Sequence, residues 1–381
     1  MKFLSSLSKK QLAGKTVLVR LDLNVEASDS AHSIRIQRAI ETIQFLRSRG
    51  ARVVVVSHRG RPQPLVEAMT NDQFPIPKIS KGETLRMFKN VFQKVLKEKV
   101  TFFDYFDFKK IKEEIAQNDN GIFLLENIRL LAGEERNSKT LAKQLASLAD
   151  MYVNDAFAVS HRAHASVAAI TSYIPSYAGI ELEQELHALS RALQKTDKPL
   201  VVILGGAKIS DKIGVIRSFA KADAIVTGGG IANTLFAAQG KYIGDSLYEK
   251  GVAVKNIIRM KNVFLPLDPV WSERKILDAG PATAKEYGDI MKAARMVVWN
   301  GPLGLTEQKR FSQGTKVVWN ALCAFGARAV VGGGETTSFI ESIATPVQRA
   351  SKRIFLSIGG GAMLEYLSGK KLPGIEALER K

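Results

Sequence analysis

Short apolar runs, rich in β-branched residues, recur along the whole chain, and stretches with a helical spacing of apolar residues separate many of them. Near-continuous apolar runs of this kind are typical of strands buried on both faces, as in parallel sheets. They predict strands within 16–24, 51–60, 100–107, 121–127 and 150–157 in the first half, and within 200–206, 223–230, 262–268, 296–301, 329–334 and 353–361 in the second.

The stretches between these runs predict helices, of which 33–50 and 139–150 are clear examples. Strand and helix therefore alternate as βα units, which predicts an α/β chain with two doubly wound parallel sheets. We expect the break between the sheets at about 163–180. The next segment, 181–195, predicts a helix that connects the domains or caps one of them, because one stripe carries Leu182, Leu186, Leu189 and Leu193. A loop is expected at 60–78, since its four prolines disfavour regular structure.

Length and composition limit the class of protein. A chain of 381 residues suits two domains, and an apolar fraction of 45% can fill both cores, which excludes a disordered chain. The first residues lack the apolar stretch of a secretory signal, and no run approaches the ~20 apolar residues of a membrane span. A single cysteine, Cys323, excludes an intramolecular disulfide and a cysteine-built metal site. We therefore expect a cytoplasmic protein with no membrane partner.

The formal net charge of +18 is compatible with nucleic acid, a membrane surface or small anionic substrates. No long Lys/Arg run, zinc-finger spacing or RNA-recognition signature occurs. A solvated basic surface is the simpler interpretation of most of these charges, and nucleic acid is not the expected partner. A nucleic-acid-binding protein stays an alternative, and it predicts binding that falls steeply with salt.

Glycines follow the strands of the second half, and ligands of open parallel sheets bind beyond the carboxyl ends of the strands. Glycine lets a ligand approach the backbone, and the helix that follows offers N–H groups to an anion. Several clusters within one half favour a phosphate- or nucleotide-binding domain over ordinary turns. The clusters are Gly205–Gly206, Gly228–Gly230, Gly301, Gly332–Gly334 and Gly359–Gly361.

Polar and basic residues follow the strands of the first half instead. Arginine binds phosphate or carboxylate through two parallel hydrogen bonds, so a repeated arginine at strand ends predicts a shared site for a small, highly charged anion. Each arginine taken alone would be a surface charge. The residues at these strand ends are Asp22, Asn24, His58, Arg61, Asn127, Arg129, Asn154, His161 and Arg162.

Lys208 and Lys212 follow the first glycine pair of the second half. If 207–212 begins a helix, the two side chains lie one turn apart, roughly 6 Å from each other, and an anion would have to neutralise them. The alternative is that both point to solvent, with Asp211 reducing their repulsion. The preceding glycines favour a phosphate ligand.

Two widespread nucleotide motifs are missing from the sequence. The motif GxxxxGK[ST] does not occur, because "GKT" at 14–16 lacks the first glycine, at position 9. The motif GxGxxG does not occur either, because the glycine triplets read "GGGIAN", "GGGETT" and "GGGAML". A dinucleotide-dependent dehydrogenase is therefore only an alternative, and it predicts binding of a nicotinamide cofactor.

Nine segments resemble, in order, the signatures of the phosphoglycerate kinase family and extend from residue 21 to residue 374. They are "LDLN", "SHRGRP", "LLENIR", "YVNDAF", "HRAHAS", "GGAKISDK", "WNGPLG", "GGGET" and "GGGAMLE…GKKLPG". The resemblance implies a glycolytic phosphotransferase with a carboxyl group as acceptor. Such an enzyme reversibly converts 1,3-bisphosphoglycerate and ADP into 3-phosphoglycerate and ATP, with Mg²⁺ bound to the nucleotide.

The resemblance also implies two sets of site residues. Those expected to bind the acid substrate are Asp22, Asn24, Arg35, His58, Arg61, Arg129 and Arg162. Those expected to bind the nucleotide are Gly205, Lys208, Lys212, Gly228, Gly229, Asn300, Pro302, Glu307, Gly332, Gly333, Gly334, Glu335 and Thr336. Because a carboxylate needs no base to attack phosphorus, catalysis is expected to rest on positioning and charge neutralisation by Arg35, Lys208 and Lys212.

For the domains, the resemblance implies two Rossmann-like sheets and a monomer that closes about a hinge. The acid-binding domain is expected at 1–165 plus 366–381, the nucleotide-binding domain at 180–365, and the hinge with an interdomain helix at 166–195.

Three positions depart from the family pattern. Glu335 stands where an aspartate that helps to hold Mg²⁺ is usual, so its role as the metal ligand is a hypothesis. Ile358 replaces a threonine and removes a hydroxyl group, and Arg59 replaces an apolar residue and is expected to add positive charge near the acid site.

Overall fold

The computed structural model describes residues 1–25, 33–64, 79–118, 121–194 and 196–380. Most of the predicted loop 60–78 lies outside the described residues. The chain divides into two compact units, one formed by 1–186 with 371–381 and the other by 187–370. Helix α6 (Ile180–Gln194) begins in unit 1 and ends in unit 2, and its buried Leu182, Leu186 and Leu189 lie on one stripe.

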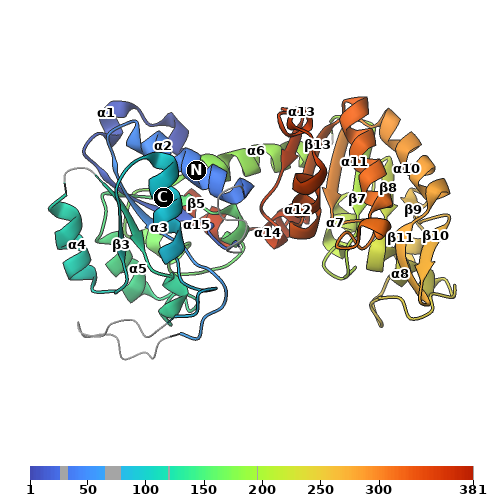
Figure 1. The fold of residues 1–381 in the computed structure, drawn as a ribbon, viewed down its shortest axis with the longest axis horizontal. Coiled ribbons are helices and arrows are strands. Elements are labelled where there is room, and N and C mark those ends of the chain that lie inside the picture. Colours follow the sequence, from blue (N-terminus) through green and yellow to red (C-terminus); the bar gives the residue numbers. More distant parts are fainter. Residues whose placement is uncertain (26–32, 65–78, 119–120, 195, 381) are drawn as a thin grey trace. The chain divides into compact units, whose positions relative to one another are not determined.

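Unit 1 is built on a six-stranded sheet in which all pairings are parallel and the order is β3-β4-β2-β1-β5-β6 (Figure 1). Its strands are β1 (Thr16–Leu21), β2 (Arg52–Val56), β3 (Val100–Phe103), β4 (Ile122–Leu125), β5 (Met151–Asp155) and β6 (Ser176–Ala178). Its other α-helices are α1 (Lys9–Leu12), α2 (Ile34–Arg47), α3 (Arg86–Leu96), α4 (Phe108–Ala116), α5 (Lys139–Ala146) and α15 (Pro373–Glu379).

Apolar residues fill both faces of this sheet, as the uninterrupted apolar runs predict. On β1, Val17, Val19 and Leu21 belong to one core cluster and Leu18 belongs to the other. Successive side chains of a strand point to opposite faces, so a strand covered on both sides needs an apolar residue at nearly every position.

Unit 2 repeats the architecture with a six-stranded parallel sheet of order β14-β13-β12-β7-β8-β9. Its strands are β7 (Leu200–Leu204), β8 (Ala224–Thr227), β9 (Val263–Phe264), β12 (Met296–Asn300), β13 (Arg328–Gly332) and β14 (Ile354–Leu356). Its helices are α7 (Ile213–Ser218), α8 (Gly229–Ala238), α9 (Lys255–Ile258), α10 (Pro281–Ala293), α11 (Gln313–Phe325), α12 (Gly334–Ile343), α13 (Pro346–Arg349) and α14 (Gly361–Leu367).

Every predicted strand is confirmed, but the sequence pattern missed two features. Strand β6 is short and mixes polar with apolar residues, so it carries no recognisable pattern. The antiparallel hairpin of β10 (Pro269–Ser272) and β11 (Lys275–Ala279) turns through Glu273 and Arg274, both with positive φ, rather than through glycine. Non-glycine residues rarely signal such a turn.

The topology places one switch point in each sheet, where successive connections leave a strand in opposite directions. In unit 1, β1 connects to β2 on one side and has β5 on the other; in unit 2, β7 lies between β8 and β12 in the same way. Ligands of doubly wound sheets bind beyond the carboxyl ends of the strands at this point. The residues after β1, β5, β7 and β12 are therefore the expected positions of ligand-binding and catalytic side chains.

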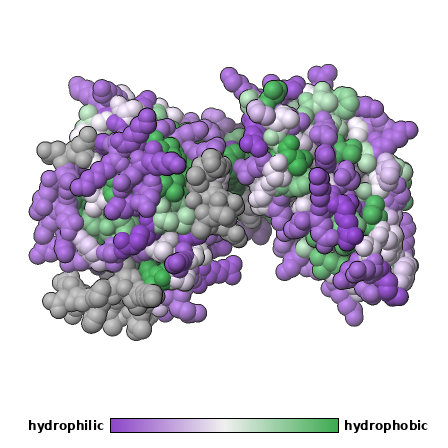
Figure 2. All heavy atoms as spheres, viewed as in Figure 1, coloured by the Kyte–Doolittle hydropathy of each residue, from purple (hydrophilic) through white to green (hydrophobic). Residues whose placement is uncertain are grey.

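Hydrophilic residues dominate the face of each unit drawn in Figure 2, with apolar patches scattered among them. No helix in the described part of the chain has the length and apolar character needed to cross a membrane.

Candidate active site

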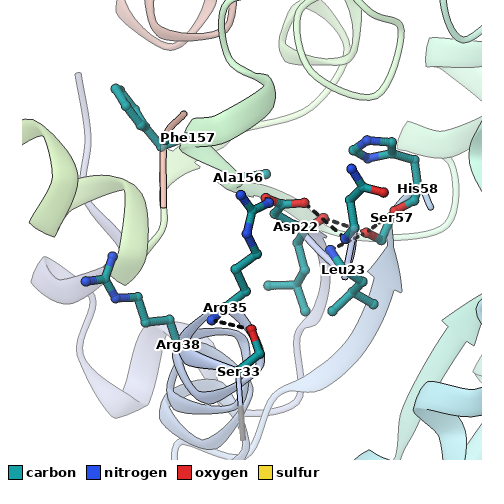
Figure 3. Close-up of polar contacts among 12 residues, drawn as sticks. Asp22, Leu23, Ser33, Arg35, Arg38, Ser57, His58, Ala156 and Phe157 are labelled. Carbon is teal, nitrogen blue, oxygen red and sulfur yellow. Dashed lines mark hydrogen bonds and ion pairs between the residues drawn. The ribbon is translucent and has the colours of Figure 1, made fainter. Parts of the chain in front are cut away.

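In unit 1, Asp22 and Arg35 form an ion pair where β1 ends. Arg35 lies in the first turn of α2, since Ser33 caps the helix and its hydroxyl accepts a hydrogen bond from the Arg35 N–H (3.3 Å). Figure 3 shows the Arg35 guanidinium group directed at the Asp22 carboxylate. The Asp22 side chain is buried, whereas 24% of the Arg35 side chain is exposed and can meet a ligand.

A chain of hydrogen bonds extends from Asp22 to the loops after β2 and β4. Asp22 Oδ1 accepts from the Asn24 N–H (3.1 Å), and Asn24 Oδ1 accepts from the Gly60 N–H (2.9 Å). Gly60, with φ of +63°, in turn offers its carbonyl to Arg129 Nη1 (2.6 Å). Arg61 follows Gly60 directly and is exposed.

His58 is buried at the end of β2 among cations. Burial, followed by the charges of Arg20, Arg129, Arg162 and His164, holds the pKa of His58 well below its ordinary value. Burial and the charge of Arg162 likewise lower the pKa of Arg129 to about 10. Several positive groups are therefore concentrated here, although Glu135 forms an ion pair with Arg129 (3.3 Å) and Glu134 lies 3.6 Å from His164 Nδ1. Such a concentration suits a small anion with several negative charges.

The structure thus gathers most of the predicted acid-binding residues in one region of unit 1. Three other residues play a different part. Asn127 and Asn154 satisfy neighbouring groups: Asn127 Nδ2 donates to the carbonyls of Arg59 (2.6 Å) and Glu83 (2.8 Å), and Asn154 Nδ2 donates to Ser160 Oγ (3.2 Å). Arg59 has a structural role as well, and its expected contribution of positive charge near the acid site stays a prediction. Its buried guanidinium group donates to three backbone carbonyls, those of Val25, Lys81 and Thr84, which places its charge in a loop-stabilising role.

In unit 2, the loops after β7 and β12 pack backbone against backbone. A Cβ at Gly205 would lie 1.9 Å from the Pro302 carbonyl oxygen, and one at Gly301 would lie 2.1 Å from the Gly205 oxygen. The N–H groups of Gly205 and Gly206 donate to the carbonyls of Asn300 (3.0 Å) and Pro302 (2.9 Å). These glycines permit a contact that any side chain would prevent.

The glycines after β8 pack in the same manner. The Gly228 N–H donates to Leu204 O (3.1 Å) and the Gly229 N–H to Leu303 O (2.9 Å), while a Cβ at Gly228 would lie 2.6 Å from Leu303 Cδ2. The N–H groups of Gly205, Gly228 and Gly229 therefore already have partners within the protein, and the expected contact of these residues with a nucleotide stays a prediction. Their contribution is to hold the strand-end loops together.

The N-terminus of α12 is an open glycine segment of unit 2, as is that of α14, where a Cβ at Gly360 or Gly361 would have no atom within 4 Å. Gly333 has a φ of +98°, and Gly334 has no atom within 4 Å of the position of a Cβ. The first N–H groups of a helix lack partners within it, so this turn can accept an anion. Glu335 is exposed in the same turn, and Thr336 is buried with no hydrogen-bond partner for its hydroxyl. Gly332, at the end of β13, packs against Met363.

Lys212 is a buried cation of unit 2. Only 9% of the residue is exposed, and its ammonium group donates to Asn300 Oδ1 at the end of β12. Burial lowers the pKa of Lys212 to about 8, against the opposing charges of Asp211 and Glu335. This side chain therefore lies near both the end of β12 and the first turn of α12.

The predicted helical pairing of Lys208 with Lys212 is wrong, because α7 begins only at Ile213. Lys208 is exposed, and its charge helps to lower the pKa of Glu249, whose carboxylate accepts chiefly from the Ser210 hydroxyl (2.6 Å) and N–H (2.9 Å). The two lysines thus lie in different surroundings. Glu307 is exposed in the turn that follows Pro302.

Comparison with known proteins decides between the alternatives. Residues 7–370 match the model of the family described as phosphoglycerate kinase. The chain belongs to the phosphoglycerate kinase family. It is 34% identical to a phosphoglycerate kinase structure from Coxiella burnetii, with a TM-score of 0.79 and coverage of 99% of this chain and 98% of that chain. It is 29% identical to one from Pyrococcus horikoshii OT3, with a TM-score of 0.81 and coverage of 100% and 98%.

Phosphoglycerate kinase of glycolysis transfers a phosphoryl group reversibly between 1,3-bisphosphoglycerate and ADP, giving 3-phosphoglycerate and ATP. This activity needs one site for a small, highly charged acid and one for a nucleotide. The dehydrogenase alternative is set aside.

Sequence reasoning missed a buried set of groups beneath His58. Arg20, inside β1, is 1% exposed and donates to His58, Ser166 and a backbone carbonyl, while Glu134 and Ser166 complete the set. The available signal was an arginine in the middle of an apolar strand, "TVLVRL". Such a residue must find buried partners, because a buried charge without them is costly.

Among the residues that the structure describes, no group of three or more His, Cys, Asp or Glu side chains could hold a metal ion. Mg²⁺ bound with a nucleotide commonly takes only one or two protein carboxylates, with the other ligands coming from phosphates and water. The exposed Glu335 beside an open helix N-terminus fits this limited requirement.

Proposed function

We propose that unit 1 binds 3-phosphoglycerate or 1,3-bisphosphoglycerate, and that unit 2 binds ADP or ATP together with Mg²⁺. The concentration of arginines around Asp22 and His58 supports the first assignment. The buried Lys212 beside the open first turn of α12 supports the second. The observation that carries the proposal is that both sets follow the carboxyl ends of the parallel strands of their own sheet, at and beside its switch point.

In unit 1, Arg35 would bind the reacting end of the acid substrate, with Asp22 fixing its orientation. Arg61, Arg129 and Arg162 would bind the phosphate group, and Asn24 and His58 would donate the remaining hydrogen bonds. Bidentate guanidinium groups suit both carboxylate and phosphate, which are the two ends of 3-phosphoglycerate.

In unit 2, Lys212 would neutralise charge on the transferred phosphoryl group, since its ammonium group is buried and already oriented by Asn300. Gly333, Gly334 and Thr336 would bind phosphate oxygens at the N-terminus of α12. Glu335 would hold Mg²⁺, and the ion would supply further neutralisation of phosphate charge. Lys208 and Glu307 would contact the nucleotide from exposed positions, and Pro302 would do so from the packed loop after β12.

No general base is required, because the carboxylate of 3-phosphoglycerate is already a nucleophile. The protein would contribute positioning and preorganised positive charge to an in-line transfer. Direct transfer requires the two bound substrates to meet, and closure about the hinge is the proposed step that achieves this. We also propose that the enzyme acts in the cytoplasm as a monomer, in keeping with a glycolytic role and a single cysteine.

A coupled assay that follows ATP formation from ADP and 1,3-bisphosphoglycerate tests the assignment of the two sites. Arg35→Ala should lower kcat by about a hundredfold or more, because it removes a group that acts on the reacting end of the substrate. Nucleotide binding to the same variant, measured by calorimetry, should stay within twofold of the unaltered enzyme. Arg86→Ala is the matched control, since Arg86 forms an exposed surface ion pair with Asp104. Near-normal turnover by Arg35→Ala would refute the proposed role.

A further inference from the structure

Arg20 lies inside β1 with 1% of its surface exposed, although arginine cannot lose its charge in a protein. A buried guanidinium group must direct its donors at specific acceptors. Nη1 donates to the Leu21 carbonyl (2.6 Å) and Nε donates to Ser166 Oγ (3.0 Å). The remaining nitrogen, Nη2, lies 3.0 Å from Nδ1 of His58.

This last contact determines which nitrogen of His58 carries a proton. A guanidinium group donates hydrogen bonds and accepts none, so Nδ1 of His58 must be the acceptor. A histidine whose Nδ1 accepts is uncharged and carries its proton on Nε2. An imidazolium ring would instead direct a second N–H at the Arg20 donor, and both would lose a hydrogen bond.

A second layer of groups fixes Arg20 itself. Glu134 is fully buried and accepts from Ser166 twice, from the hydroxyl at 2.6 Å and from the N–H at 2.9 Å. Because the Ser166 hydroxyl proton is directed at Glu134, its oxygen is available to accept from Arg20 Nε. Glu134 thereby balances the charge of Arg20 through Ser166 without competing for the donor that reaches His58.

The other charged groups around His58 act in the same direction. Arg129, Arg162 and His164 all add positive potential at the ring, and His164 Nδ1 lies 3.6 Å from the Glu134 carboxylate. Burial and the charge of Arg20 are the larger reasons why the pKa of His58 is lowered. The ring is therefore a neutral donor within a strongly cationic region.

We propose that Arg20 is a positioning residue that holds His58 as the neutral Nε2–H tautomer, so that His58 offers an N–H donor, and not a lone pair, to the anionic substrate of unit 1. The inference rests on the proposed acid-binding role of this region. The tautomer matters because a nitrogen lone pair would repel a phosphate or carboxylate oxygen of the substrate, whereas an N–H group donates a hydrogen bond to that oxygen.

The test is nitrogen NMR of the full-length enzyme labelled with ¹⁵N-histidine, which distinguishes the two neutral tautomers and the imidazolium form. The chain has only five histidines, and a His58→Gln sample assigns the signals of His58. The unaltered enzyme should show a protonated Nε2 and an unprotonated Nδ1 throughout pH 6–8, without titration. Detection of an imidazolium ring or of the Nδ1–H tautomer at pH 7 would overturn the proposal, and this measurement needs no variant.

Arg20→Met then tests whether Arg20 is the cause. His58 should become a mixture of the two neutral tautomers, because burial and the remaining cations still disfavour its charged form. The KM for 3-phosphoglycerate should rise by about tenfold, while the KM for ATP changes by less than twofold. A correctly folded Arg20→Met whose His58 signals match those of the unaltered enzyme would contradict the positioning role. Failure of the proposed function is distinguishable: adding 3-phosphoglycerate would then leave the His58 signals unshifted even with the tautomer as proposed.

Discussion

Binding of a nucleotide at Lys212 should be accompanied by uptake of a proton at alkaline pH. The pKa of this buried lysine is lowered to about 8 from 10.5, which means that charging it costs about 3 kcal/mol more than in water. Phosphate oxygens beside the ammonium group would favour the charged form and raise the pKa again. The nucleotide therefore binds most tightly when Lys212 is protonated.

The size and pH range of the effect follow from these two values. At pH 9 a group with a pKa of about 8 is roughly one-tenth protonated, whereas one restored to 10.5 is almost fully protonated. About 0.9 proton should then be taken up per nucleotide at pH 9, and only about 0.1 at pH 7. Nucleotide affinity should therefore be highest below pH 8 and should fall as pH rises from about 8 toward 10.5.

Isothermal titration of the enzyme with MgADP at pH 9, in buffers of different ionisation enthalpy, gives the number of protons directly. The slope of the observed enthalpy against the buffer enthalpy should be near one in the unaltered enzyme and near zero in Lys212→Met. Lys221→Met is the matched control, because Lys221 is an exposed lysine between α7 and β8. A slope near zero in the unaltered enzyme, or an unchanged slope in Lys212→Met, would refute the reasoning.

Two further predictions concern the strand-end loops of unit 2. Gly301→Ala should lower the free energy of unfolding, measured in urea, by more than ~3 kcal/mol, because φ is +94° and the new Cβ would meet the Gly205 backbone. Gly334→Ala should lower it by less than ~1 kcal/mol, because the space around that position is open. If both variants unfold alike, the close packing of these loops is not what requires glycine. Glu335→Gln should raise severalfold the Mg²⁺ concentration that gives the half-maximal rate. The control Glu341→Gln, at the far end of α12, should leave that concentration unchanged. An unchanged Mg²⁺ dependence in Glu335→Gln would exclude Glu335 as a ligand.

The sequence predicted the sheets well because a strand covered on both faces leaves a strong pattern. The run "LVVIL" leaves no polar position for a solvent face, nor does the "VVVV" that follows Arg52, and both became interior strands. The regions that hold the chemistry could also be predicted, since the polar and glycine residues directly follow those strands. Recognition of strand ends therefore needs only local information.

The partners of individual side chains were harder to predict, because they depend on contacts between segments far apart in the sequence. Two lysines four positions apart suggested one helix face, yet the chain stays irregular until Ile213 and sends Lys212 to Asn300, 88 positions away. The interaction of Arg20 with His58 spans 38 positions and that with Ser166 spans 146. Glycine also has two uses that sequence alone does not separate: Gly205 packs against backbone, whereas Gly334 is open.

Both candidate sites hold positive groups in surroundings that disfavour their charge. Burial is the largest cause of the lowered pKa of His58, of Arg129 and of Lys212. A polyanion that enters either region replaces the lost solvation of such groups, so part of its binding free energy comes from relief of an unfavourable state that the fold has already imposed. His58 differs from Arg129 and Lys212, because Arg20 keeps it neutral. A neutral donor binds an anion without taking up a proton. Binding of the acid substrate should therefore leave the protonation of His58 unchanged, whereas binding of the nucleotide at alkaline pH should add a proton to Lys212.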